Sequence, residues 1–145
     1  MIVDASVILR AFFPDEAQAQ AQSLIRDHVI SRVNLEAPDL ILYEACNAVW
    51  QAERRSRILG EQADQIIEAI EGLHIALHPL KWGEMLPIAR QFNCTAYDAA
   101  YLTLAHNHDT NLVTGDERLY NSVHPHLGWV LWIGDYLSPQ SANPF

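Results

Sequence analysis

Short apolar runs alternate with longer amphipathic stretches along the chain. Runs typical of buried strands lie at 2–3, 36–37, 74–78, 111–114 and 129–133. Apolar residues at helical spacing predict helices over 7–13, 15–29, 39–59, 61–71, 82–92, 95–106 and 116–121. Strands separated by helices connect through right-handed crossovers, which build a parallel sheet covered on both faces. The pattern therefore predicts an α/β fold, a three-layer α/β/α sandwich around a central, mostly parallel sheet.

Residues that begin or end helices support these limits. Pro14 ends the first helix, and Asp15 and Glu16 favour a new start because acidic side chains stabilise the positive end of the helix dipole. Gly60 and Gly72 end the two helices before them. The last residues are rich in Pro, Ser and Asn. We expect a single domain over 1–137 and a short polar tail over 138–145.

Composition narrows the class of protein. With 145 residues, half of them hydrophobic, the chain can form one domain with a substantial core. A net charge of −9 argues against a protein that binds nucleic acid by broad phosphate neutralisation, but not against a nuclease whose cations supply local positive charge. Cys46 and Cys94 lack zinc-ligand spacing and are expected to be buried free thiols. No apolar run approaches the ~20 residues of a membrane helix. We expect a soluble, cytoplasmic protein with no membrane contact.

Four acidic residues fall where such a sheet forms a crevice. Asp4 and Asp116 follow short apolar runs, and Glu44 and Asp98 lie near the starts of apolar helices. The carboxyl ends of parallel strands and the helix starts beside them face one crevice. Carboxylates brought together there repel one another unless a hard divalent cation such as Mg²⁺ or Mn²⁺ binds them. A metal in that position most often acts on phosphate esters.

Each carboxylate also has an ordinary structural explanation. Asp4 and Asp116 suit helix N-caps or turns, and Thr95-Ala-Tyr-Asp98 matches a capping box. Glu44 is harder to explain in this way because it falls on the apolar stripe of its helix, where charged residues are rare without a partner or metal. Four unrelated caps need not converge, so the common location favours a shared metal site.

Four short motifs carry these acids. They are Ile2-Val-Asp-Ala-Ser6, Tyr43-Glu-Ala-Cys-Asn47, Tyr97-Asp-Ala-Ala-Tyr-Leu-Thr-Leu-Ala105 and Leu112-Val-Thr-Gly-Asp116, of which the third is the most specific. In this order and at this spacing they resemble the PIN-domain nucleases, in particular the VapC-type ribonuclease toxins, over nearly the whole chain. The resemblance implies that all four acids bind one or two Mg²⁺ or Mn²⁺ ions. It also implies a homodimer and a cognate antitoxin protein that blocks the site.

Neighbouring side chains are expected to assist the four acids. By the resemblance, Ser6 and Thr114 would give polar support, and Asn47 shares the helix face of Glu44. Glu117 directly follows Asp116, and either could be the fourth ligand. Three arginines near the end of the Glu44 helix either meet the helix dipole or contact RNA phosphates: Arg54, Arg55 and Arg57.

The histidines and tryptophans have simpler interpretations. The pairs His106/His108 and His124/His126 are expected on loops or the surface, because catalytic zinc usually takes three convergent protein ligands. The four tryptophans, at 50, 82, 129 and 132, are expected in the core or at a subunit interface. A nucleotide-binding P-loop or dinucleotide fold is excluded because no glycine-rich loop follows the first strand.

The sequence thus predicts a metal-dependent endoribonuclease that hydrolyses RNA phosphodiesters as the toxin of a toxin–antitoxin pair. One alternative is a PIN-like module that binds protein or RNA without cleaving it, but a retired site has no reason to retain repelling carboxylates. The other is a DNA-directed nuclease of related architecture. The small size and the lack of a basic clamp argue against it.

Overall fold

The computed structural model describes residues 1–139 and arranges them around one parallel sheet. Its strands are β1 (Ile2–Val3), β2 (Glu36–Pro38), β3 (Ala76–His78), β4 (Leu112–Thr114) and β5 (Val130–Trp132). Its helices are α1 (Ala5–Phe12), α2 (Ala19–Val29), α3 (Leu40–Arg54), α4 (Gly60–Glu71), α5 (Trp82–Phe92), α6 (Ala96–Asn107) and α7 (Glu117–Val123), followed by the 3₁₀ turn η1 (Ile133–Asp135).

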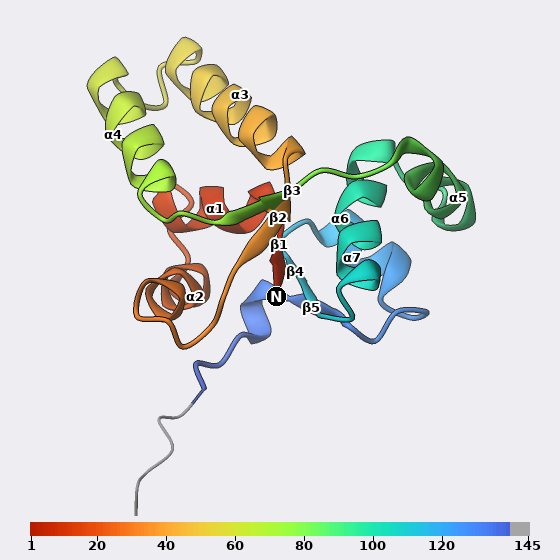
Figure 1. Ribbon diagram of the computed structural model, residues 1–145. Coiled ribbons are helices and arrows are strands. Elements are labelled where there is room, and N and C mark those ends of the chain that lie inside the picture. The colour runs from red at the N-terminus through yellow and green to blue at the C-terminus, as the bar shows by residue number, and fades with distance from the viewer. Residues whose placement is uncertain (140–145) are drawn as a thin grey trace, which may run out of the picture.

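The sheet has the strand order β3-β2-β1-β4-β5, and every neighbouring pair is parallel. Helices α1 and α2 lie on one side of it and α6 and α7 on the other, while α3 and α4 extend beyond one end (Figure 1). The predicted three-layer α/β/α sandwich is confirmed. All five predicted strands form, and the sheet is parallel throughout rather than mostly so.

The central strand β1 shows why so short a strand suffices. Successive side chains of a strand point to opposite faces. Ile2 packs in the cluster that contains residues of α6 and α7, while Val3 packs in the cluster of α1 and α2. Both are completely buried. Two apolar residues therefore anchor both layers, and the next residue, Asp4, emerges at the carboxyl end of the sheet.

Helices α2 and α3 differ from the predicted limits. Helix α2 begins at Ala19, not at Asp15, because Asp15 and Glu16 lie in a turn where both contact the Arg57 guanidinium. Helix α3 ends at Arg54 instead of continuing to residue 59. The turn that follows carries Ile58 into a buried cluster with residues of α3 and α4. In both places long-range contacts override a local signal.

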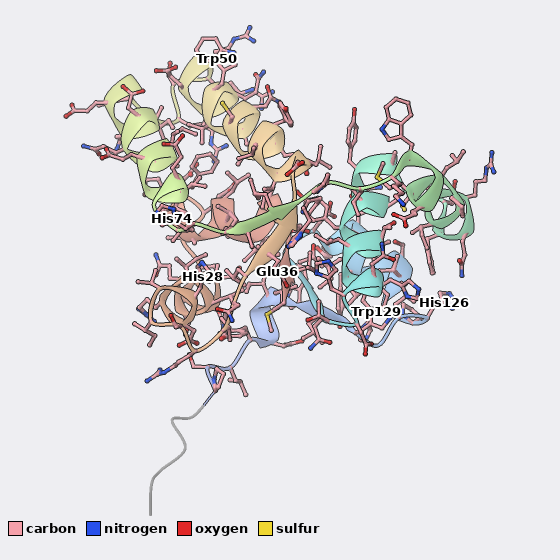
Figure 2. The ribbon with its side chains drawn as sticks, viewed as in Figure 1. His28, Glu36, Trp50, His74, His126 and Trp129 are labelled. Atoms are coloured by element: carbon pink, nitrogen blue, oxygen red, sulfur yellow. The ribbon has the colours of Figure 1, made fainter. Side chains whose placement is uncertain are left out.

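Some residues expected in the core lie at the surface. Cys46 is exposed, so the prediction of a buried thiol is wrong there, whereas Cys94 is partly buried and both are free. Trp82 is 86% exposed, and Trp50 lies exposed near the outer end of α3 (Figure 2). Neither belongs to the core, because each projects from a helix face that no other described element covers.

The carboxyl end of the described chain is fixed to α2. The Ser138 hydroxyl donates to the buried carboxylate of Asp27 at 2.5 Å, and the Tyr136 hydroxyl donates to the same oxygen at 2.7 Å. The predicted tail thus begins with a residue that contacts the domain, and its residues 140–145 lie outside the described part. Within 1–139, no helix has both the length and the apolarity needed to cross a bilayer.

Candidate functional site

Asp4 occupies the centre of the carboxyl end of the sheet. It follows β1 directly and caps α1, accepting a hydrogen bond from the Val7 amide at 3.3 Å. Its other partners are hydroxyls: Ser6 donates to Oδ1 at 2.5 Å and Thr114 donates to Oδ2. Only 5% of the residue is exposed. The capping interpretation is therefore correct, but it accounts for one of three donors.

The segment after β4 connects Asp4 to Asp116. The Thr114 hydroxyl that donates to Asp4 also accepts from the Asp116 amide at 3.0 Å. The Gly115 amide donates to Ser6 Oγ at 2.8 Å, and a Cβ at residue 115 would lie 2.8 Å from Arg10 Nε. A larger residue there would therefore displace the Arg10 side chain of α1. Asp116 in turn caps α7 through the Leu119 amide at 3.1 Å.

Glu44 and Tyr101 join α3 to α6. Glu44 is partly buried in the first half of α3, and the Tyr101 hydroxyl donates to its Oε1 at 2.6 Å. Tyr101 is almost completely buried, and burial raises the pKa of its hydroxyl, an effect to which the Glu44 charge adds. A neutral tyrosine thus holds the Glu44 carboxylate in one orientation. This agrees with the expectation that Glu44 needs a partner.

Asp98 lies in the first turn of α6 but does not complete a capping box. Its amide donates to Thr95 Oγ1 at 3.0 Å, which is the helix-cap half of that motif. Its carboxylate faces Arg118, whose Nη2 lies 3.2 Å from Asp98 Oδ2 and 3.9 Å from Asp116 Oδ2. The side chain of Arg118 is 67% exposed. One solvated cation therefore bridges two of the predicted ligands.

Burial and repulsion between neighbouring acids raise the pKa values of Asp4 and Glu44. Burial raises the pKa of Asp4 to about 6, with a smaller contribution from the Asp116 charge, although the bonds from Ser6, Thr114 and Val7 oppose it. Burial also raises the pKa of Glu44, and the Asp98 charge adds to this while the Tyr101 bond opposes it. The four carboxylates thus form two electrostatically coupled pairs.

The donor set suits a hard cation such as Mg²⁺ or Mn²⁺. All four side chains offer carboxylate oxygens, which such ions prefer, and a cation would relieve the repulsion that adds to the effect of burial on the pKa values of Asp4 and Glu44. No three of the four acids place oxygens within 4.8 Å of one another. Magnesium commonly retains several waters and binds through one or two carboxylates, so this spacing fits that mode of binding.

A cleft opens beside the acids. It has a volume of about 490 Å³ and is lined by Ser6, Leu9, Arg10, Glu16 and Asp116. The Arg10 guanidinium donates to the Gly115 carbonyl at 2.7 Å and lies over the Trp132 ring, 5.5 Å from its centroid. Arginine and aspartate side chains therefore share one open groove at the end of the sheet.

Several predicted supporting residues lie apart from this network. Asn47 and Glu117 are exposed and make no side-chain hydrogen bond with the described residues. Arg57 donates to both carboxylate oxygens of Asp15, at 2.9 and 3.0 Å, and lies over the Phe13 ring. Arg54 lies over the Trp50 ring, 5.7 Å from its centroid. Arg57 is engaged within the protein, whereas the role of Arg54 and Arg55 stays a prediction.

Sequence reasoning missed Tyr101, Arg10 and Arg118. Tyr101 lies within the third motif, and the two arginines lie a few residues after the first and fourth motifs. Tyr101 lies three residues after Asp98 and shares its helix face, and Arg10 lies four residues after Ser6. Arg118 follows Asp116 by two residues in the first turn of α7. None of these spacings specifies a partner without the fold.

The chain is similar to known proteins over most of its length. The family model described as the PIN domain matches residues 1–123. The chain is 30% identical to Ribonuclease VapC3 of Pyrobaculum aerophilum over 82% of this chain and 91% of that protein. It is 31% identical to Exonuclease VapC9 of the same organism over 61% of this chain and 66% of that protein. The crystal structure of PAE2754, also from Pyrobaculum aerophilum, has a TM-score of 0.70 at 23% identity, covering 91% of this chain and 82% of that one.

Proposed function

The chain belongs to the PIN-domain family, and we propose that it is a metal-dependent endoribonuclease, the toxin of a toxin–antitoxin pair. The observation that carries the proposal is the hydrogen-bonded and electrostatic network that links Asp4, Glu44, Asp98 and Asp116 at the carboxyl end of the sheet. The names of the two curated relatives, a ribonuclease and an exonuclease, support nucleolytic activity.

We propose that these four acids hold Mg²⁺ or Mn²⁺. When bound, the cation would activate the attacking water and stabilise the charge that develops on the phosphate. The chain supplies orientation: Ser6 and Thr114 fix the Asp4 carboxylate, and Tyr101 fixes Glu44. Without a cation, Arg118 partly neutralises the charge of Asp98 and Asp116. Once a cation neutralises these two acids, Arg118 would be available to bind a substrate phosphate.

RNA would enter the cleft beside Asp116. Arg10 lines that cleft and Arg118 lies at Asp116, so the two arginines place positive charge beside the acids of a chain whose net charge is −9. Binding would then be weak and local rather than spread along a basic surface. RNA selectivity would come from the shape of the substrate, because water rather than the 2′-hydroxyl is the nucleophile.

Cleavage of a labelled RNA tests the activity. We expect cleavage with Mg²⁺ or Mn²⁺, loss of cleavage in EDTA, and products with 5′-phosphate and 3′-hydroxyl ends. Products with 2′,3′-cyclic phosphate would show that the ribose is the nucleophile and would contradict the mechanism. A closed circular RNA separates the endonuclease from an exonuclease, which cannot attack it, and a DNA of the same sequence tests the DNA-directed alternative.

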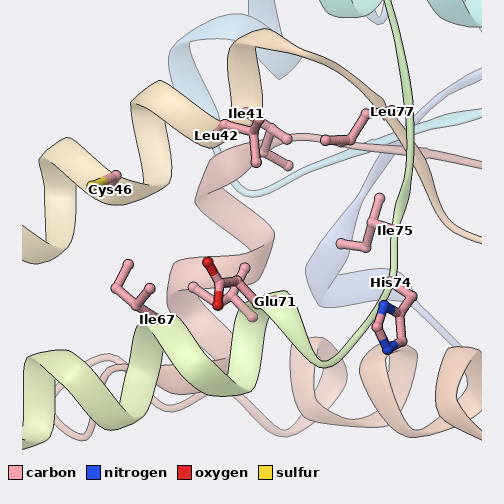
Figure 3. Close-up of a pocket in the computed structure, with 9 residues that line it drawn as sticks. Ile41, Leu42, Cys46, Ile67, Glu71, His74, Ile75 and Leu77 are labelled. Atoms are coloured by element: carbon pink, nitrogen blue, oxygen red, sulfur yellow. The ribbon is translucent and has the colours of Figure 1, made fainter.

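An apolar groove offers a surface for the antitoxin. It has a volume of about 450 Å³ and lies between α3, α4 and β3 (Figure 3), lined by Ile41, Leu42, Cys46, Ile67, Ile70, Glu71, His74, Ile75 and Leu77. Large exposed apolar patches mark interaction sites in soluble proteins. We propose that an apolar segment of the antitoxin occupies this groove. Replacing Cys46 by Arg should prevent a stable complex with a co-expressed antitoxin and leave RNA cleavage intact.

The same surface argument supports a homodimer. Exposed apolar side chains gather on α5 and the start of α6, namely Trp82, Leu86 and Tyr97. Light scattering should give twice the mass of the chain, and Trp82→Glu should give the mass of the monomer. A cytoplasmic location follows from the proposed RNA substrate and agrees with two free thiols.

A further inference from the structure

A second group of candidate ligands lies at the end of α6 opposite Asp98. Glu36 on β2, His78 on β3 and His108 at the C-terminal cap of α6 each place one ligand atom within 4.8 Å of the other two. Among the residues that the structure describes, no other three His, Cys, Asp or Glu side chains meet this criterion. The ten-residue separation of Asp98 and His108 corresponds to about 15 Å along a helix.

The sheet register brings the first two ligands together. Glu36 pairs with Ala76 and Pro38 pairs with His78. Side chains two positions apart in a strand share a face, so Glu36 and His78 project from the same side of the sheet. Ile2 pairs with Glu36, so its side chain projects from this same side of the sheet, where it packs against α6. Figure 2 shows Glu36 at the sheet beside α6, whose end supplies His108.

The two distances from Glu36 are close to those between ligands of one metal ion. Glu36 Oε1 lies 2.8 Å from His78 Nε2 and 3.5 Å from His108 Nδ1. Ligands at about 2.0–2.1 Å from a tetrahedral zinc ion stand about 3.3 Å from one another. The observed separations lie on either side of that value. The three side chains are 27%, 33% and 31% exposed, respectively, which leaves access for an ion and for water as a fourth ligand.

An ordinary hydrogen bond explains only part of this arrangement. His78 and Glu36 form one at 2.8 Å. His108 forms no side-chain hydrogen bond with residues 1–139, although its ring meets the His78 ring edge to face with centroids 4.6 Å apart. The remaining charged group facing Glu36 is the Met1 ammonium, which donates to the Asn34 carbonyl. The His108 imidazole thus lies beside the Glu36 carboxylate without a hydrogen bond to it, and an imidazole in this position can complete a set of three protein ligands.

We propose that Glu36, His78 and His108 bind one zinc-class cation, Zn²⁺, Co²⁺ or Ni²⁺, which fastens the edge strand β3 to β2 and α6. Two imidazoles and one carboxylate form a donor set that such ions favour. The four acids offer oxygen alone and favour Mg²⁺ or Mn²⁺. The domain would thus bind two classes of metal ion, one at each end of α6. The zinc-class ion would stabilise the fold and would not take part in RNA cleavage.

Calorimetric titration with Zn²⁺ in excess Mg²⁺ tests the proposal, because Mg²⁺ occupies the acidic site and leaves the histidine site free. We expect one equivalent of Zn²⁺ to bind the full chain. His78→Ala and His108→Ala should each weaken binding by at least the roughly 10- to 100-fold that loss of an outer-shell partner costs. Zn²⁺ should raise the melting temperature of the parent protein but not of these variants.

Two further variants are matched controls. His126→Ala removes an exposed histidine outside the group, and Asp98→Asn alters the acidic site; both should bind Zn²⁺ as the parent does. Circular dichroism confirms the fold of each variant, and Glu36→Gln, which keeps the side-chain shape, gives a third test of the ligand set. Absence of zinc binding, unchanged binding in both histidine variants, or loss of binding in Asp98→Asn would overturn the proposal. The readout is metal binding alone, so it is independent of nuclease activity.

Discussion

Asp4 accepts hydrogen bonds from three donors and is almost completely excluded from water. The donors favour its charged form and the burial disfavours it, and burial has the larger effect because the pKa rises to about 6. A native pKa above the unfolded value of about 3.9 means that the folded state holds its proton more tightly. Without metal, this residue therefore stabilises the fold most at low pH.

The first prediction concerns stability as a function of pH. In EDTA, the free energy of unfolding should lose about 3 kcal/mol from this residue as pH rises from about 4 through about 6, at 1.36 kcal/mol per pKa unit. Asp4→Asn should remove that slope, since an amide does not ionise, while Asp64→Asn, at an exposed position of α4, should keep it. Urea unfolding at a series of pH values measures both. Parallel curves for Asp4→Asn and the parent would contradict this account of Asp4.

The second prediction distinguishes Asp116 from Glu117. Asparagine caps helices about as well as aspartate, so Asp116→Asn should keep the cap of α7 and change stability by less than about 1 kcal/mol. It should nevertheless abolish RNA cleavage if Asp116 is the ligand. Glu117 is exposed, and Glu117→Gln should keep most of the activity. Cleavage assays of the two purified variants distinguish the two residues. An active Asp116→Asn variant and an inactive Glu117→Gln variant would assign the fourth ligand to Glu117.

At the scale of elements, α3 and α6 meet through Glu44 and Tyr101. Tyr101→Phe removes the donor and leaves the partly buried Glu44 without it. Bonds to charged groups contribute about 1.5–3 kcal/mol, so we expect a loss of that order in unfolding free energy. We also expect weaker Mg²⁺ binding, because Glu44 would no longer be held in place. Calorimetry and urea unfolding measure the two effects. An unchanged affinity for Mg²⁺ would show that Tyr101 does not position Glu44.

Local patterns predicted the element order well, and the failures occurred where distant contacts decide. The helix predicted over 82–92 has the same limits as α5, and all five predicted strands form. Helix α2 differs because Arg57 binds Asp15 and Glu16, 42 and 41 residues away in sequence, and α3 differs because Ile58 packs into a buried cluster. The motifs predict the four acids as ligands, which stays a prediction, but they do not predict Arg118, because its partner Asp98 lies on another helix.

The arginines of different elements should differ in their effect on RNA binding. Arg57 is held by Asp15 and Glu16, so Arg57→Ala should leave RNA affinity unchanged. Arg118→Ala should weaken it about fivefold, near 1 kcal/mol for one solvated ion pair. Fluorescence anisotropy with a labelled RNA in Ca²⁺ measures the affinity without turnover. Equal losses for both variants would place the RNA elsewhere than the cleft beside Asp116.

For the whole molecule, a net charge of −9 and a cluster of acids at one end of the sheet make cation binding a stabilising event. A ligand that binds only the folded state raises its melting temperature by mass action. Millimolar Mg²⁺ should therefore raise the melting temperature of the parent protein and of Asp64→Asn, and raise that of Asp98→Asn much less. No shift in the parent protein would count against a preformed site.

The most direct test is RNA cleavage by Asp98→Asn with Mg²⁺ present. The substitution keeps the shape of the side chain, and the lost ion pair with the exposed Arg118 costs at most about 1 kcal/mol. If Asp98 is a metal ligand, cleavage falls by orders of magnitude while the protein stays folded and Asp64→Asn remains active. If Asp98 only stabilises the first turn of α6, the variant cleaves RNA at nearly the parent rate. That result would contradict the proposed active site.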